Sequence, residues 1–186
     1  MKVSAARRTE LQHEVTPSTP TEDGRALPVT CSREDAAWIH ETLRRAGLPA
    51  TISRRLVLLL LRKHPVRHMS PEQLCAAMTR LPDATGISTF RRAIHELAHL
   101  NLLARIFVPS SGSGINFYEL PDHSAHAHFY CTECRRIEEI HDDPLISLQN
   151  RRLLRHGLTP NALVQTAWVG LCAACQADGA IDISAR

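Results

Sequence analysis

Two Cys-x-x-Cys pairs constrain the fold of this 186-residue chain more than any other feature of its sequence. Cys131 and Cys134 form the first pair, and Cys172 and Cys175 form the second. Each spacing suits a tight turn that directs two thiolates at one point, and two such turns build the closed tetrahedral S₄ site that structural zinc prefers. We therefore predict that a structural Zn²⁺ holds together the segment between residues 131 and 175.

Three other interpretations of these cysteines remain open: a thioredoxin-like redox pair, two structural disulfides and an iron–sulfur site. The redox pair lacks the βαβ context that such motifs normally have. The N-terminal residues have no apolar core of a secretory signal, and the longest apolar run, residues 56–61, is too short to cross a bilayer. A cytoplasmic protein without membrane contact is therefore expected, and cytosolic thiols stay reduced, which disfavours disulfides.

Charge and composition divide the chain into three parts. Residues 33–105 carry twelve basic and six acidic side chains, whereas residues 106–186 carry six basic and nine acidic ones. A basic segment suits a polyanion such as DNA, because lysine and arginine release the counterions condensed on phosphates, although a solvated basic face would show the same bias. Residues 1–32 are rich in proline and small polar residues and are predicted to be a flexible extension.

The segment 33–120 has the order of elements of a winged-helix DNA-binding domain. Caps and helix-ending glycine or proline residues predict helices from Ser32 to about Arg45, over 54–63, from Ser70 to about Leu81, and from about Ser88 onward. The last of these, the predicted recognition helix, has an apolar stripe formed by Phe90, Ile94, Leu97 and Leu100. Two strands, at 102–108 and 115–120, would form the wing.

Residues 121–186 predict a small α+β unit after the boundary at Pro121. Strands are expected at 126–130, 136–140 and 163–169, with a helix over about 144–156. A unit of this size needs a staple or a partner subunit to bury enough apolar surface. The whole chain is therefore predicted to be an α+β protein, with an N-terminal winged-helix domain followed by a small dimerisation domain that contains structural zinc.

A second candidate metal site lies just before the first cysteine pair. His126 and His128 stand two apart on a predicted strand, so both side chains point to one face. Glu119 ends the preceding strand and lies within reach of that face. Histidine and carboxylate ligands suit Fe²⁺, Mn²⁺ or Zn²⁺. Surface histidines beside a loop are the alternative, and the neighbouring Cys-x-x-Cys pair favours a metal site.

In this order the motifs resemble the ferric uptake regulator family of metal-responsive transcriptional repressors. The resemblance covers residues 35–176 and rests on a set of short motifs: Arg45-Ala-Gly47, Thr51-x-x-Arg54, His68-x-Ser-x-Glu72 and the pattern E-x₆-H-x-H-x₂-C-x₂-C beginning at Glu119. It implies a metal-loaded homodimer that binds double-stranded operator DNA and represses genes for iron or zinc uptake.

The resemblance also implies roles for particular residues. The family's regulatory site, which would hold a second divalent ion, Fe²⁺ or Zn²⁺, is matched by His68, Glu119, His126 and His128. The positions that imply DNA contacts are Arg45, Arg54, Thr89, Arg91 and Arg92. With ligands on both sides of the hinge, metal occupancy would fix the angle between the two recognition helices of a dimer.

The sequence departs from the family at three places. Arg91 stands where many members have tyrosine, which predicts an altered operator because arginine prefers guanine edges or phosphate. A further family metal site is expected to be lost, because Ala125, Ala127 and Ile146 occupy its ligand positions. Arg135 replaces the glycine that often follows the first cysteine pair.

Two alternative functions remain at this stage. A peroxide-sensing repressor of the same family would oxidise a ligand histidine at bound Fe²⁺, although such sensors tend to have aspartate in place of Glu119. A zinc-binding enzyme would need an open coordination position and a general base. The sequence contains no H-E-x-x-H or G-x-S-x-G motif, which disfavours an enzyme. The two remaining cysteines are expected to be a small core residue, Cys75, and a free thiol in the extension, Cys31.

Overall fold

The computed structural model describes residues 30–179, apart from residues 66, 111–113 and 122–125. Most of the predicted extension, Ala125 and the tip of the predicted wing therefore lie outside the described residues. The helical half comprises α1 (Arg33–Arg45), α2 (Ile52–Lys63), α3 (Pro71–Met78) and α4 (Ile87–His99). The strands β1 (Ala104–Val108) and β2 (Ile115–Glu119) follow it. The C-terminal half comprises β3 (Ala127–Cys131), β4 (Ile137–Ile140), α5 (Asp143–Arg155), β5 (Val164–Thr166), β6 (Trp168–Gly170) and α6 (Ala173–Gly179).

The helices begin where side chains cap them. Ser32 caps α1 in a capping box with Asp35, and Thr51 caps α2. Ser70 caps α3, with Pro71 as the first helical residue. Each cap satisfies backbone N–H groups that have no partner within the helix. The third helix ends at Met78, earlier than the sequence suggested.

The main core lies between the helices, and α2 runs through its centre. Residues 56–61 of α2 are all buried, because α1, α3 and α4 each pack against this helix. Three of the four predicted stripe residues of α4 are buried, but Leu100 is 41% exposed. That part of the prediction was wrong because α4 ends at His99 and Leu100 is its C-cap, where the helical periodicity stops. Cys75 is buried in this core, as expected.

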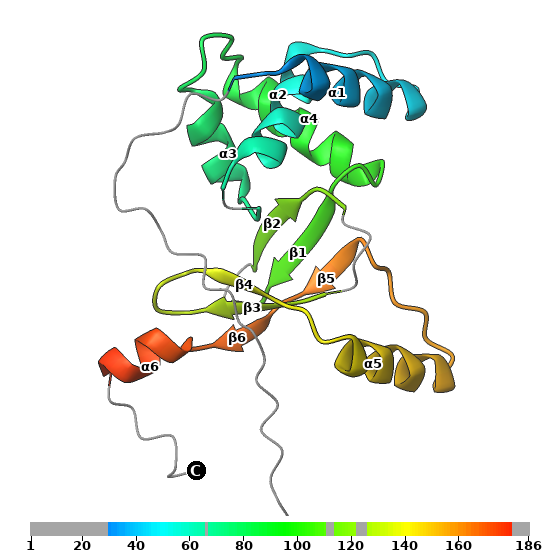
Figure 1. Ribbon diagram of the computed structural model, residues 1–186, viewed down its shortest axis with the longest axis vertical. Helices are drawn as coiled ribbons and strands as arrows, with labels where there is room; N and C mark the ends of the chain where they lie inside the picture. The colour runs from blue at the N-terminus through cyan, green and yellow to red at the C-terminus, as the bar shows by residue number, and fades with distance from the viewer. Residues whose placement is uncertain (1–29, 66, 111–113, 122–125, 180–186) are drawn as a thin grey trace, which may run out of the picture.

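The strands form two three-stranded sheets that share one segment of the chain. The first has the order β2-β1-β5 and the second has the order β4-β3-β6. β5 runs parallel to β1, and β6 runs parallel to β3. The sequence predicted one strand over 163–169, whereas the structure divides this segment at Ala167 and places its two parts in different sheets (Figure 1).

A second core joins the wing to the C-terminal half. It consists of residues from β1 and β2, from β3, and from the link between β5 and β6: Ile106, Val108, Phe117, Tyr130 and Ala167. Two backbone hydrogen bonds beyond the sheet register reinforce it, from Arg105 N–H to the Leu163 carbonyl (2.8 Å) and from Ala167 N–H to the Phe107 carbonyl (3.0 Å). The domain boundary at residue 121 stays a prediction, and the wing is packed against the residues that follow it.

Within the part of the chain that the structure describes, no helix is both long enough and apolar enough to span a bilayer.

The shared core predicts that both halves unfold together. Ile106 is fully buried, so Ile106→Ala should lower the free energy of unfolding by about 2–5 kcal/mol, through lost burial and a residual cavity. The chain has two tryptophans, Trp38 in α1 and Trp168 in β6, so the variants Trp38→Phe and Trp168→Phe each leave one fluorescent reporter, in the opposite half. Chemical denaturation should give coincident transitions at both reporters, and Ile106→Ala should shift both.

The exposed neighbour Arg105 on the same strand serves as the control, and Arg105→Ala should shift the transitions by less than about 0.5 kcal/mol. Two separate transitions, with only the Trp168 reporter affected by Ile106→Ala, would show that the halves fold independently.

Candidate metal centres

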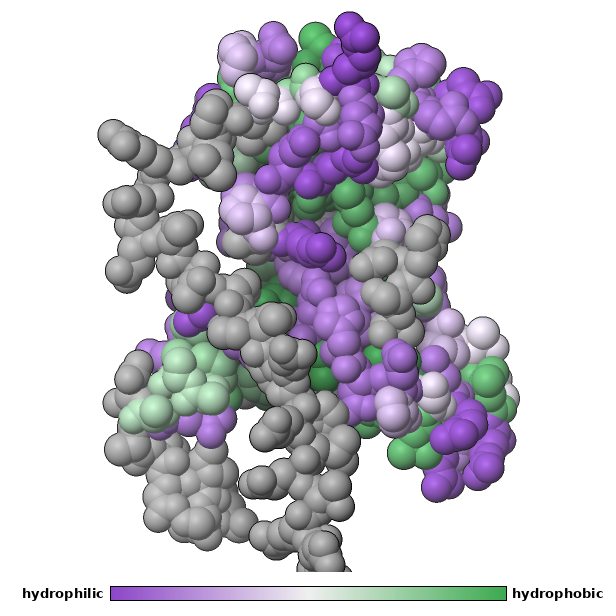
Figure 2. All heavy atoms as spheres, in the orientation of Figure 1, coloured by the Kyte–Doolittle hydropathy of each residue, from purple (hydrophilic) through white to green (hydrophobic). Residues whose placement is uncertain are grey.

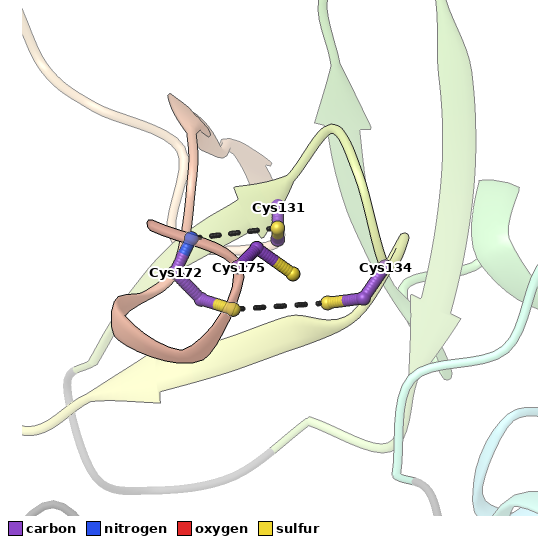
Figure 3. A group of neighbouring side chains, drawn as sticks. All are labelled: Cys131, Cys134, Cys172 and Cys175. Atoms are coloured by element: carbon purple, nitrogen blue, oxygen red, sulfur yellow. Dashed lines mark hydrogen bonds between the residues drawn. The ribbon is translucent and has the colours of Figure 1, made fainter. Parts of the chain in front are cut away.

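The four cysteines of the two pairs meet at one end of the β4-β3-β6 sheet. Cys131 ends β3, Cys134 lies in the turn before β4, Cys172 follows β6, and Cys175 lies in the first turn of α6. Their sulfur atoms all lie within 4.8 Å of one another and face a common centre (Figure 3). The Cys134 and Cys172 sulfurs are 3.8 Å apart. A tetrahedron with Zn–S bonds of about 2.3 Å requires a sulfur–sulfur separation of roughly this size, so the cluster fits zinc.

The pKa values of the cysteine thiols also fit a cluster that binds a cation. Burial raises the pKa of Cys131, but backbone N–H groups, above all that of Cys172 at 3.4 Å, outweigh burial and lower it to about 6. The neighbouring thiol of Cys172, together with burial, raises the pKa of Cys175 to about 12. Sulfurs this close cannot all ionise beside one another, because like charges repel. A divalent cation removes that repulsion and allows four thiolates to form.

Two arginines directly follow the first cysteine pair. Arg136 hydrogen-bonds Cys134, and this bond raises the pKa of the guanidinium. Arg135 adopts a φ of +59° and donates its backbone N–H to the Cys131 carbonyl at 2.9 Å. This left-handed conformation explains why glycine is common at this position in the family that the sequence resembles, since a side chain with a Cβ is strained there.

The second cluster lies where the helical half meets the C-terminal half. It brings together the four residues that the sequence indicated, His68, Glu119, His126 and His128, and all four are buried. The Nε2 atoms of the three histidines converge on Glu119 Oε2, at 2.9 Å from His68 and 3.5 Å from each of the other two. The Nε2 atoms of His68 and His128 are 3.1 Å apart. Four nitrogen and oxygen donors around one point, shielded from solvent, fit a divalent transition metal.

Backbone pairing places the ligands of this cluster. His68 precedes α3, and the next residue, Met69, forms an isolated bridge with Tyr118 through hydrogen bonds of 3.1 and 2.9 Å. Because Glu119 directly follows Tyr118, this bridge brings His68 and Glu119 side by side on the helical half. His126 immediately precedes β3 and His128 lies on it, so the other two ligands come from the C-terminal half.

The carboxylate of Glu119 is held ionised in spite of its burial. Burial alone raises the pKa of Glu119, but hydrogen bonds from His126, His128 and His68 outweigh it and hold the pKa far below its usual range. Among the described residues, His128 Nδ1 is a buried atom without a hydrogen-bond partner. The site therefore combines a fixed negative charge with three imidazoles, a set that a bound cation would organise.

The structure adds one residue that the sequence analysis missed. Glu139 Oε1 lies 3.3 Å from His68 Nε2, and Glu139 Oε2 lies 3.0 Å from His141 Nε2. Glu139 is the cross-strand partner of His128 in the β3–β4 register, which places its carboxylate at the cluster. Antiparallel pairing of the predicted strands 126–130 and 136–140 was the available signal. The further family site has Ala127 and Ile146 at the ligand positions that the structure describes, and these side chains offer no ligand atom.

The residues with implied DNA contacts differ in how exposed their side chains are. Thr89, Arg91 and Arg92 lie in the first half of α4 and are exposed. Arg45 is exposed and pairs with Glu41 at 2.7 Å. Arg54, by contrast, binds Glu96 through two hydrogen bonds of 2.7 and 3.0 Å, and its side chain is only 14% exposed. Arg54 therefore ties α2 to α4 in this structure.

A comparison with protein-family models matches residues 45–163 to the ferric uptake regulator family. The chain belongs to this family. The ferric uptake regulation protein of Bordetella parapertussis is 27% identical over 134 residues, which cover 72% of this chain and 94% of the relative. That of Escherichia coli K12 is 25% identical over 119 residues, which cover 64% and 78%.

Solved structures agree with this assignment. The ferric uptake regulator of Vibrio cholerae superposes with a TM-score of 0.59 at 22% identity, covering 72% of this chain and 98% of that one. The regulator from Pseudomonas aeruginosa with manganese gives 0.56 at 26% identity, with coverages of 70% and 96%. A zinc uptake regulator complexed with zinc and DNA gives 0.51 at 20%, with coverages of 82% and 99%. The fold is thus a winged-helix domain followed by a dimerisation domain, and a ferric uptake regulator family protein is a metal-dependent transcription regulator rather than an enzyme.

Loss of one thiolate should release the metal from the cysteine cluster. Purified wild-type protein should retain about one zinc per chain in this cluster, and Cys134→Ser should lose it and destabilise the C-terminal half. Structural zinc contributes roughly 10 kcal/mol or more to folding in small domains. Zinc released by a thiol reagent can be measured with a chromogenic chelator, and the exposed Cys31 supplies the control variant Cys31→Ser. Full zinc retention in Cys134→Ser would contradict the four-thiolate site.

The strained turn at Arg135 predicts an unusual order of stabilities. Arg135→Gly should be more stable than Arg135→Ala by about 1 kcal/mol, because only glycine adopts the left-handed region without penalty. Both variants remove the same charge, so thermal unfolding of the zinc-loaded proteins isolates the backbone effect. At Arg136, where φ is not positive, alanine should be the more stable of the two. An alanine variant as stable as the glycine variant at position 135 would refute the strain.

Proposed function

We propose that this protein is a transcriptional repressor of metal-uptake genes, which binds operator DNA as a homodimer when a divalent metal occupies the His68 cluster. One observation carries the proposal: four buried ligand side chains from both halves of the chain converge on one point. A cation bound there contacts the DNA-binding half through His68 and Glu119 and the C-terminal half through His126 and His128. Metal occupancy then favours one arrangement of the two halves over all others.

The chain's own residues prepare this switch. The Met69–Tyr118 bridge fixes His68 and Glu119 relative to each other, so the helical half presents two ligands as a unit. The β3–β4 pairing fixes His128 and Glu139 on the other side. A cation would supply positive charge beside the buried carboxylate of Glu119 and the partly buried carboxylate of Glu139, and it would hold the imidazoles together. The second core also connects the two units, because it packs β1 and β2 against β3. A bound metal would therefore stabilise an arrangement that the fold itself supports.

The donor set fits a divalent transition metal as the regulatory ion. Nitrogen and carboxylate ligands accept Fe²⁺, Mn²⁺ and Zn²⁺, and no thiolate is present to select zinc. A manganese-bound ferric uptake regulator and a zinc uptake regulator both share this fold. We propose Fe²⁺ or Zn²⁺ in the His68 cluster and Zn²⁺ in the cysteine cluster.

The exposed face of α4 supports DNA as the partner. Arg91 and Arg92 project from a helix whose buried stripe, from Phe90 to Leu97, leaves the opposite side free. A helix of this kind enters the major groove in winged-helix proteins. The zinc uptake regulator with this fold forms a complex with DNA. Because α4 carries side chains suited to both phosphate and guanine, we propose that it reads the operator.

An apolar surface on the C-terminal half supports the homodimer. None of the residues of α5 is buried in the single chain, although its sequence is amphipathic. Large apolar side chains of the C-terminal half remain exposed, in α5, in the segment that follows it and in β5 and β6: Leu148, Leu154, Leu158, Val164, Trp168 and Val169. Hydrophobic residues also show at the surface over α5, at the lower right of Figure 2. Exposed apolar surface of this kind is typical of a protein interface, and a second copy of the chain would cover it.

Removing one ligand tests the proposed switch. His68→Ala should leave a folded, zinc-containing dimer whose affinity for operator DNA no longer rises when Fe²⁺ or Zn²⁺ is added. In the wild type this rise should be about 5- to 150-fold, the range expected for a coupling free energy of roughly 1–3 kcal/mol. Fluorescence anisotropy of a labelled operator measures the affinity, and size-exclusion chromatography with zinc analysis verifies the dimer.

The exposed histidine His40 on α1 provides the matched control, and His40→Ala should respond to metal like the wild type. Metal-dependent binding that survives His68→Ala would place the sensor elsewhere. Loss of the cysteine-bound zinc in His68→Ala would instead assign the cluster a purely structural role.

A further inference from the structure

An acidic residue lies on the face of the protein that is proposed to meet DNA. Glu72, near the start of α3, forms an ion pair with Arg91 on α4, with 3.1 Å between Glu72 Oε1 and Arg91 Nη2. Both side chains are well exposed, 67% for Glu72 and 48% for Arg91. A carboxylate beside a DNA-binding helix opposes binding through repulsion of phosphates. We therefore expect Glu72 to have a role that offsets this repulsion.

The backbone that carries Glu72 is firmly held. Gln73 and Ser70 form a reciprocal capping box, with hydrogen bonds of 3.2 and 2.8 Å, and Pro71 occupies the first helical position. Met69, just before the cap, is buried and bridges to Tyr118. Glu72 therefore has only its own side-chain torsions to lose when it pairs with Arg91, so it is a well-anchored partner.

We propose that Glu72 is a positioning residue that orients Arg91 toward one guanine of the operator and so sets sequence specificity at the expense of affinity; this rests on the proposed DNA-binding function. A guanidinium carries five N–H donors in a planar fork, and a bidentate contact to guanine uses two of them. The bond from Nη2 to Glu72 restricts the orientations of the fork and leaves other donors available. A free arginine at the same place would reach any nearby phosphate.

The neighbouring arginine provides an internal comparison. Within the described residues Arg92 forms no ion pair within 4.0 Å, although it lies close enough to Glu96 to help lower the pKa of that carboxyl. Without an anchoring carboxylate, Arg92 supplies attraction to the DNA backbone, whereas Arg91 supplies discrimination between bases. The two adjacent arginines thus divide affinity and specificity between them.

The experiment compares full-length wild-type protein with Glu72→Gln, which keeps the size of the side chain and removes its charge. Sites are selected from a random duplex library with metal present, and affinities are then measured for the selected site, its single-base variants and an unrelated duplex. Glu72→Gln should bind the unrelated duplex several-fold more tightly. At one guanine position its discrimination should fall from the roughly 5- to 150-fold of a bidentate contact toward none.

Two controls distinguish an effect of Glu72 on the orientation of Arg91 from a general effect of its negative charge on DNA binding. In an Arg91→Ala background, Glu72→Gln should leave base preference unchanged, because the residue it orients is gone. Glu34→Gln removes another exposed carboxylate, from α1 of the same half, and should leave base preference unchanged in the wild-type background. Circular dichroism and zinc content verify that each variant is folded.

Unchanged discrimination in Glu72→Gln overturns the inference, and so does a loss of discrimination that persists without Arg91. In both cases the wild type still selects a specific site, so the proposed function stands. A wild-type protein that enriches no sequence in the presence of metal overturns both proposals.

Discussion

Residues 164–170 pair with two strands that belong to different sheets, and the arrangement of the whole molecule depends on this double pairing. β5 holds β1 of the wing, while β6, after a single intervening residue, holds β3 of the metal-binding half. Ala167 lies between them, buried against Ile106 and Tyr130. Because backbone hydrogen bonds fix the register on both sides, the wing cannot move far from β3 without breaking one ladder. The ends of β2 and β3, which carry the metal ligands, are held near each other as a consequence.

This restraint reduces what a metal bound at the His68 cluster would have to do. A freely rotating hinge would leave the metal to create the closed arrangement by itself. Here the shared core helps to bring His68 and Glu119 to His126 and His128, and a bound cation would stabilise the same arrangement. The differential affinity of the cation for the two arrangements then limits the regulatory effect, and a pre-formed site lowers the cost of assembling the ligands. The cysteine cluster lies at another place, since Cys131 ends β3 and Cys172 follows β6. A metal bound by these cysteines would hold together the paired strands β3 and β6 of the second sheet.

Local signals in the sequence predicted most of the elements, and long-range pairing explains what they missed. Ser32, Thr51 and Ser70 are caps whose effect is confined to a few residues, and the structure has helices beginning after each. Most of the candidate ligands were also visible, because Cys-x-x-Cys and His-x-His place them within single turns or strands, whereas His68 was indicated only by the resemblance to the family. The division of segment 163–169 between two sheets depends on partners about sixty residues away in β1 and about forty in β3, which periodicity does not report. Glu139 was missed for the same reason, since only the β3–β4 register places it beside His128.

The arginines show most clearly why a motif alone does not define a role. Arg54 and Arg91 both match positions with implied DNA contacts, and each meets a glutamate from another helix. Arg54 is largely buried and bonded through two nitrogens to Glu96, so its release to DNA would cost two charge-assisted hydrogen bonds and leave the Glu96 carboxylate without them. Arg91 shares one bond with Glu72 at an exposed position, where ion pairs contribute little to stability, so Arg91 can still contact DNA. The same chemical pair therefore serves as a structural link between α2 and α4 in one case. The Glu72–Arg91 pair leaves its arginine available to a ligand. The difference between the two pairs follows from their burial.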